Sequence, residues 1–265
     1  MNKIWNKFLK EGKLFDFPII DIHCHMGFFY GSQMPYSSPE IMAKRMEKAG
    51  IKLIVFCHHY SLFFPEIGNK FNIEAVKKYP DKFKAYCAIN PNYQDTIKKD
   101  LETFDKYSDI YVGFKLLPDY HRVSLSDYRY KKVFEFANKN KLIVLTHTWG
   151  GSSYDGAEEV EKIIKKYRNL ILILGHSIHG DWKKTIEIAK NYENVYLELT
   201  AVLDERGIVE EFIENGVSNK ILFGTDFPWF NHHYYIGALI GTGINEDALR
   251  KIFYGNAMKL IKKER

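Results

Sequence analysis

Two histidines stand two residues apart at the end of an apolar run, in the segment IDIHCH at residues 20–25. In a β-strand, residues i and i+2 point to the same face, so His23 and His25 should project together while Cys24 turns away. Two neutral imidazoles side by side suit a divalent ion such as zinc. Alone, the pair is a weak signal of a metal site.

Three further apolar runs end in residues of the same chemical kinds: His147, His176 and Asp226. Each histidine taken singly is more simply read as a satisfied polar group at a strand end. An aspartate in such a place is costly unless it is paired or bound to a metal. If these four strand ends meet, they form a site for a divalent cation.

The elements that would bring these residues together recur along the whole chain. Short β-branched or aromatic runs alternate with amphipathic stretches of helical period, such as the helix expected between Ser38 and Gly50. The eight expected strands are 19–23, 53–57, 83–89, 111–116, 142–147, 170–174, 195–199 and 221–223. Strands that alternate with helices pair in parallel, and eight such units predict an α/β fold of the (β/α)8 TIM-barrel type.

A doubly wound open sheet is the alternative architecture. It would place a glycine-rich turn after the first strand, where this chain has His-Cys-His instead. A barrel carries its reactive residues at the C-terminal ends of its strands, which is where the histidines and Asp226 fall. The pattern therefore favours the barrel.

Bulk composition narrows the class of protein. The 265 residues fit one domain over 1–265, with 1–17 as an N-terminal extension. The net charge of +5 comes from lysines interleaved with acids, which argues against nucleic-acid binding. No run is long enough to span a membrane, and three cysteines in apolar runs are typical of a reduced, cytoplasmic protein. The partner expected is a small-molecule substrate, and the aromatic content is compatible with a homodimer.

Several segments together resemble one known family. The matching residues are 21–25, 113–116, 146–147, 174–176, 221–229 and 255–260, and they span nearly the whole chain. The run FGTDFPW at residues 223–229 is the most specific of them. The sequence is similar to the amidohydrolase superfamily, and most closely to the amidohydrolase-related branch that includes aminocarboxymuconate semialdehyde decarboxylase.

The resemblance implies a division of roles among the strand-end residues. His23, His25, His147 and Asp226 would be the metal ligands, and Asp226 would also take part in catalysis. His176 would stand beside the metal as a catalytic group that moves protons. A second histidine, His179, follows closely and leaves the division of labour between the two open.

Lys115 has two interpretations at the end of the fourth strand. Its ammonium could bind a substrate carboxylate in a site with one divalent ion, for which the donor types favour zinc. In other amidohydrolases a carboxylated lysine at this strand bridges two metals, so a second metal is the alternative. Trp149, Trp229 and Arg122 complete the candidate pocket. Loop packing would explain the two tryptophans equally well, and for Arg122 a surface ion pair is favoured over a contact with a substrate anion.

Three functions follow, in order of preference. The first is a metal-dependent hydrolase that uses a metal-activated water on a small amide, ester or lactone. The second is a metal-dependent non-oxidative decarboxylase of an unsaturated or aromatic carboxylic acid. The third is a metal-binding barrel without catalytic activity, which the retention of His176 and Asp226 beside the site disfavours.

Overall fold

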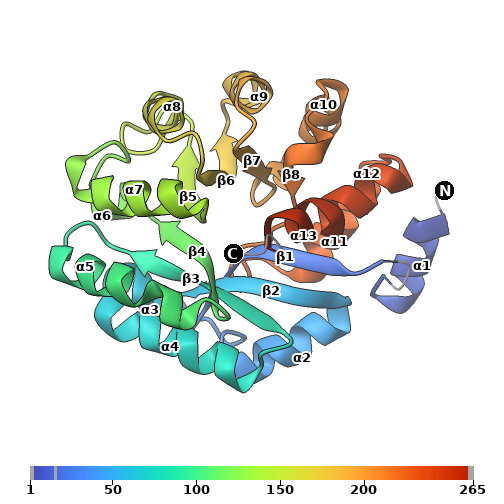
Figure 1. The fold of residues 1–265 in the computed structure, drawn as a ribbon. Coiled ribbons are helices and arrows are strands. Elements are labelled where there is room, and N and C mark those ends of the chain that lie inside the picture. The colour runs from blue at the N-terminus through green and yellow to red at the C-terminus, as the bar shows by residue number, and fades with distance from the viewer. Residues whose placement is uncertain (1–2, 15–16, 262–265) are drawn as a thin grey trace.

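Eight parallel strands follow one another in chain order around a single sheet in this computed structural model (Figure 1). The structure describes residues 3–14 and 17–261. The strands are β1 (Ile19–Met26), β2 (Ile51–His58), β3 (Phe83–Ile89), β4 (Tyr111–Leu116), β5 (Ile143–Trp149), β6 (Ile171–His179), β7 (Val195–Glu198) and β8 (Ile221–Leu222). All eight expected strands are present.

Helices stand between successive strands along the chain, and others precede the first strand or follow the last (Figure 1). They are α1 (Lys3–Glu11), α2 (Pro39–Ala49), α3 (His59–Phe63), α4 (Pro65–Lys78), α5 (Gln94–Thr103), α6 (Pro118–His121), α7 (Lys131–Asn140), α8 (Ala157–Lys166), α9 (Trp182–Asn191), α10 (Ile208–Glu214), α11 (His232–Gly241), α12 (Glu246–Arg250) and α13 (Asn256–Ile261). Parallel neighbours require such crossovers, because a tight hairpin cannot return the chain to the same end of the sheet.

The segment after β8 closes the sheet against β1. The backbone N–H of Ile22 donates to the carbonyl of Phe223 at 3.0 Å, and that of Asp226 donates to the carbonyl of His23 at 2.8 Å. These bonds join the last strand region to the first, so the sheet becomes a nearly closed barrel. The predicted (β/α)8 fold is confirmed.

Two apolar clusters hold the barrel, one inside the ring of strands and one between strands and helices. In β2, Val55 and Cys57 belong to the inner cluster, whereas Ile54 and Phe56 belong to the outer one. This follows from the two-residue period of a strand whose faces are both covered. The C-terminal helix α13 adds Leu260 to the inner cluster.

The ends of α2 show how the sequence sets a helix boundary. The Ser38 side chain accepts a hydrogen bond from the backbone N–H of Ile41 at 3.4 Å, and Pro39 follows in the first turn. Gly50 ends the helix with φ of 76°, a left-handed conformation that costs glycine little. The helix expected between Ser38 and Gly50 is therefore confirmed, with both of its predicted end signals.

The extension expected at 1–17 contains α1, which packs against α11, where the ring centroid of the buried Phe8 lies 6.5 Å from that of His233. Residues 1–2 and 15–16 of this extension lie outside the described part. Among the described residues, no helix combines the length and the apolar character needed to cross a membrane.

Gly113 in β4 gives a direct test of barrel packing. A Cβ at this position would lie 2.0 Å from the carbonyl oxygen of Ile143 in β5. We expect Gly113→Ala to lower the free energy of unfolding by about 3 kcal/mol, because the clash is with backbone that can move only if two strands separate. Gly241→Ala, which places its Cβ 3.5 Å from Trp5, is the matched control. Equal stability of both variants in urea denaturation would contradict this packing.

Candidate metal centre

An irregularity in β1 turns both of its histidines into the barrel mouth. Ile22 belongs to the inner apolar cluster, and simple alternation would therefore turn His23 outward. The pairing of β1 with β2 shifts by one residue between Asp21 and Cys24, which is a β-bulge. Above it, His23 and His25 both line the cavity at the C-terminal ends of the strands.

The rings of His23 and His25 are each fixed through Nδ1. Nδ1 of His23 lies 2.8 Å from a carboxylate oxygen of Glu198 at the end of β7. Nδ1 of His25 lies 3.0 Å from the backbone carbonyl of Cys57. Both partners can only accept here, so each Nδ1 carries the proton and each Nε2 keeps its lone pair for the cavity. This arrangement is the one that metal-binding imidazoles require.

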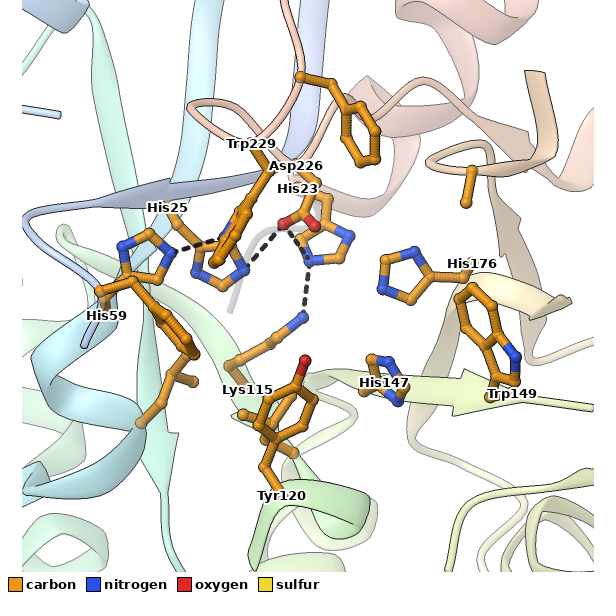
Figure 2. Close-up of a pocket in the computed structure, with 15 residues that line it drawn as sticks. His23, His25, His59, Lys115, Tyr120, His147, Trp149, His176, Asp226 and Trp229 are labelled. Carbon is orange, nitrogen blue, oxygen red and sulfur yellow. Dashed lines mark hydrogen bonds and ion pairs between the residues drawn. The ribbon is translucent and has the colours of Figure 1, made fainter. Parts of the chain in front are cut away.

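Asp226 supplies a carboxylate at the same place. Its Oδ1 lies 3.0 Å from Nε2 of His25 and 3.6 Å from Nε2 of His23. Figure 2 shows the three side chains turned toward one another.

Asp21 fixes the loop that carries Asp226. Its carboxylate accepts hydrogen bonds from the hydroxyl of Thr225 at 2.5 Å, the backbone N–H of Thr225 at 3.2 Å and the backbone N–H of His23 at 3.2 Å. Asp226 itself has φ of 55°, a left-handed conformation that costs a non-glycine residue about 1–3 kcal/mol. The bonds to Asp21 hold both strand ends against that cost.

These three donors fit a divalent cation. Oδ1 of Asp226 is buried and has no hydrogen-bond donor among the described residues. The donor atoms of His23, His25 and Asp226 all lie within 4.8 Å of one another. A buried carboxylate oxygen that faces two imidazole lone pairs is costly without a positive charge between them, and a metal ion supplies that charge.

His147 lines the same cavity from β5 but stands outside this group of three. Its Nδ1 lies 2.8 Å from Oδ2 of the fully buried Asp155, so its Nε2 is also left with a lone pair. Its ring centroid is 4.8 Å from that of His176. The orientation suits a ligand, and its place in the ligand set stays a prediction.

His176 stands at the wall of the cavity with its ring centroid 5.3 Å from that of His23. It begins a run of left-handed residues, with φ of 65° here and of 52° at Ser177. The run is held because the backbone N–H of His176 and the hydroxyl of Ser177 both donate to Glu198. Burial and the nearby imidazoles lower the pKa of His176 well below its usual value, so the ring is neutral.

Lys115 reaches the centre of the site from β4. Its Nζ lies 2.7 Å from Nε2 of His23, and its side chain is buried. Because Nδ1 of His23 holds the proton, Nε2 accepts and the lysine donates. Burial lowers the pKa of Lys115, whereas the Asp226 carboxylate opposes that shift.

The remaining pocket predictions have different outcomes. Trp149 and Trp229 line the cavity, which has a volume of about 230 Å³. His179 lies behind Trp149, stacked on it at 4.2 Å, and is not among the described residues that line the cavity. Arg122 is exposed and faces Tyr154, so its side chain is likewise absent from the described lining. Arg122 ends the four-residue helix α6 in a left-handed conformation, which reverses the chain. Its closeness to Lys115 in the sequence therefore does not bring it into the pocket.

Sequence reasoning missed three residues of the site: Glu198, Asp155 and Tyr120. Glu198 and Asp155 orient histidines, and Tyr120 lines the cavity. His59 accepts from the indole N–H of Trp229 at 2.9 Å, and burial lowers its pKa to about 3. Glu198 had a usable signal, since it stands one residue before the end of the seventh expected strand, 195–199.

Comparison with known proteins identifies the family of the chain. A family model described as amidohydrolase matches residues 20–263, and the chain therefore belongs to the amidohydrolase family. This confirms the resemblance noted from the sequence and makes the chain a metal-dependent enzyme by family. A comparison with curated proteins found no match.

Solved structures with the same fold are distant in sequence. An uncharacterised TIM-barrel protein from Bordetella bronchiseptica has 21% identity and a TM-score of 0.76, over 92% of this chain and 98% of that one. The 5-carboxyvanillate decarboxylase from Sphingomonas paucimobilis has 12% identity and a TM-score of 0.74, over 93% and 99%. A dihydroxybenzoic acid decarboxylase from Polaromonas sp. JS666, with bound manganese and 2-nitroresorcinol, has 16% identity and a TM-score of 0.72, over 94% and 98%.

Glu198→Gln tests whether the carboxylate that orients His23 supports metal binding. We expect the affinity for a divalent ion to fall about 10- to 100-fold, because the amide is a weaker acceptor and cannot fix the imidazole proton as firmly. Competition against a chelating dye would measure this. Glu205→Gln is the matched control, since Glu205 contacts His179 outside the cavity lining. Equal affinities in both variants would contradict the orienting role.

Proposed function

We propose that the chain is a decarboxylase of a small planar carboxylic acid, unsaturated or aromatic, that works with one divalent metal ion. The observation that carries this proposal is the contact between Nζ of Lys115 and Nε2 of His23 at 2.7 Å. A metal ion bound at His23 would take the lone pair that now accepts from the lysine. The buried Nζ would then need a new acceptor, and a substrate carboxylate provides one.

The ligands proposed for the ion are His23, His25 and Asp226, with His147 completing the set across the cavity. When bound, the ion supplies a Lewis acid that polarises a substrate oxygen. Imidazole and carboxylate donors suit zinc, the metal expected from the sequence, and also manganese, which the Polaromonas decarboxylase structure contains. Because Lys115 serves here as a cation, we propose one ion per chain rather than two.

The aromatic walls of the cavity favour a flat substrate. Phe29, Tyr120, Trp149 and Trp229 line it, and Leu117 adds aliphatic surface. Aromatic faces bind planar rings well and contribute large apolar contact. Lys115 is the one lysine or arginine among the described residues of the lining, so a single anionic group would be paired near the ligands.

His176 is the group that we propose to move the proton. When the carboxylate leaves as carbon dioxide, the carbon that carried it keeps the bonding electron pair and must gain a proton. Nδ1 of His176 is buried without a hydrogen-bond partner among the described residues, so the neutral ring is not committed elsewhere. The neutral ring would take up one proton from solvent through the open mouth, pass it to that carbon and return to its neutral form.

Hydrolysis of a small amide, ester or lactone is the second candidate. The observation that favours it is the same neutral His176, which could take a proton from an attacking water, opposite the ionised Asp226. The neighbouring decarboxylases lend weight to the first reaction, although their identity to this chain is low.

Isotopes separate the two reactions. With metal-loaded protein and a panel of hydroxybenzoates and unsaturated diacids, we expect release of carbon dioxide and incorporation of one solvent deuterium at the carbon that lost it. A parallel panel of esters and lactones in ¹⁸O-water should give no labelled acid. Labelled acid from the second panel, with no carbon dioxide from the first, would contradict decarboxylation and identify the protein as a hydrolase.

Lys115→Met tests how the substrate anion is held. We expect benzoate, used as a probe, to bind the metal-loaded variant about 10- to 100-fold more weakly, because a hydrogen bond between charged groups is lost. Metal content should stay the same, since the lysine is not a ligand in this proposal. Benzoate affinity is measured by calorimetry, and Lys183→Met, at an exposed position on α9, is the control. Unchanged benzoate binding, or loss of the metal, would contradict the assigned role.

A further inference from the structure

A second cavity of about 690 Å³ adjoins the metal cavity and is lined almost wholly by aromatic rings. We call it the aromatic antechamber. The residues that line it and do not line the metal cavity are Phe28, Tyr30, Tyr60, Phe63 and Phe64. They come from the loop after β1 and from the segment that follows β2.

The antechamber and the metal cavity share three side chains: Phe29, His59 and Tyr120. The ring centroid of Phe29 lies 4.9 Å from that of Trp229 on the metal side and 5.7 Å from that of Phe63 on the antechamber side. Phe29 therefore stands at the boundary, and a molecule in one cavity would touch the wall of the other.

His59 makes this boundary well defined. Its Nδ1 lies 2.8 Å from the backbone carbonyl of Gly27, and its Nε2 accepts from Trp229. Its ring stacks on that of His25 at 4.7 Å with an interplanar angle of 16°. The wall between the cavities is thus tied to a proposed metal ligand, to the β1 loop and to the β8 loop at once.

The antechamber exposes apolar surface without charge. Phe28 is 76% exposed and Tyr30 is 97% exposed, and Tyr60 and Phe64 are each nearly half exposed. The described residues of its lining include no acid, lysine or arginine. Clustered aromatic rings at the mouth of a cavity mark a ligand surface, because covering them removes apolar area from water.

We propose that the antechamber binds an apolar, ring-bearing extension of the substrate, while the carboxylate end of the same molecule lies in the metal cavity. This inference rests on the proposed function. It narrows the substrate to a carboxylic acid whose first ring or unsaturated unit is joined through a short linker to a second apolar group. A second copy of the chain is the less favoured occupant, because it would close the mouth that the substrate must use.

Two probes with the same carboxylate head test the inference. We expect the metal-loaded full chain to bind 4-(benzyloxy)benzoate at least about 10-fold more tightly than benzoate in calorimetry. The double variant Tyr30→Ser, Phe64→Ser should reduce that ratio to about 2 or less and leave benzoate binding unchanged. Tyr128→Ser, at an aromatic position 80% exposed on another surface, should keep the ratio. Equal affinity of the two probes in the wild type, or a ratio that survives the double variant, would overturn the inference.

A neutral probe separates this inference from the proposed function. If neither carboxylate binds, the assigned substrate class fails, and 2-naphthol fluorescence then tests the antechamber alone. Binding of 2-naphthol that persists in Asp226→Asn and is lost in the double variant would support an apolar subsite. No 2-naphthol binding would overturn it. A wild-type dimer that the double variant converts to monomer in analytical ultracentrifugation would also overturn it, in favour of a contact between copies.

Discussion

The site depends on the electrostatic problem of placing Oδ1 of Asp226 next to two imidazole lone pairs inside a protein. Nδ1 of His23 and Nδ1 of His25 are both committed to acceptors, so neither ring can turn a proton toward the carboxylate without giving up its partner. The positive charge that the described residues bring near Asp226 is the Lys115 ammonium, and it is directed at Nε2 of His23 rather than at the carboxylate. A divalent cation removes the conflict, and much of the surrounding architecture serves to hold these atoms in place.

The backbone around the site departs from regular geometry where the side chains must be aimed. The bulge in β1 changes which side chains face inward after Ile22, and left-handed conformations occur at His176 and Asp226. Each departure is held by a buried carboxylate, Asp21 for the β8 loop and Glu198 for the end of β6. Two acids that are not themselves proposed ligands thus maintain the strained segments that carry the reacting groups.

Much of the fold was readable from the sequence, because strand runs and helix end signals are local. All eight strands, and α2 with its Ser38 and Gly50 ends, follow from patterns within a few residues. The shared direction of His23 and His25 was predicted from alternation, yet the bulge that makes it compatible with an inward Ile22 was not. A register shift depends on the neighbouring strand, and no pattern within β1 records it.

The composition of the site was less readable than its location. Lys115 lies at the centre as the end of the fourth strand suggested, whereas Arg122 turns away because a left-handed residue reverses the chain after α6. Asp155 reaches His147 from a loop, and such contacts depend on loop conformations that periodicity does not encode. Ligand types at strand ends are therefore predictable from sequence, while the groups that orient them are much less so.

The most direct measurement is the metal content of the full chain purified without chelators, compared with that of His25→Ala. The geometry around Asp226 predicts about one equivalent of divalent metal per wild-type chain and a large loss of metal in the variant. A metal-free wild-type protein that takes up no zinc or manganese would contradict the account. So would a His25→Ala protein that retains its full equivalent.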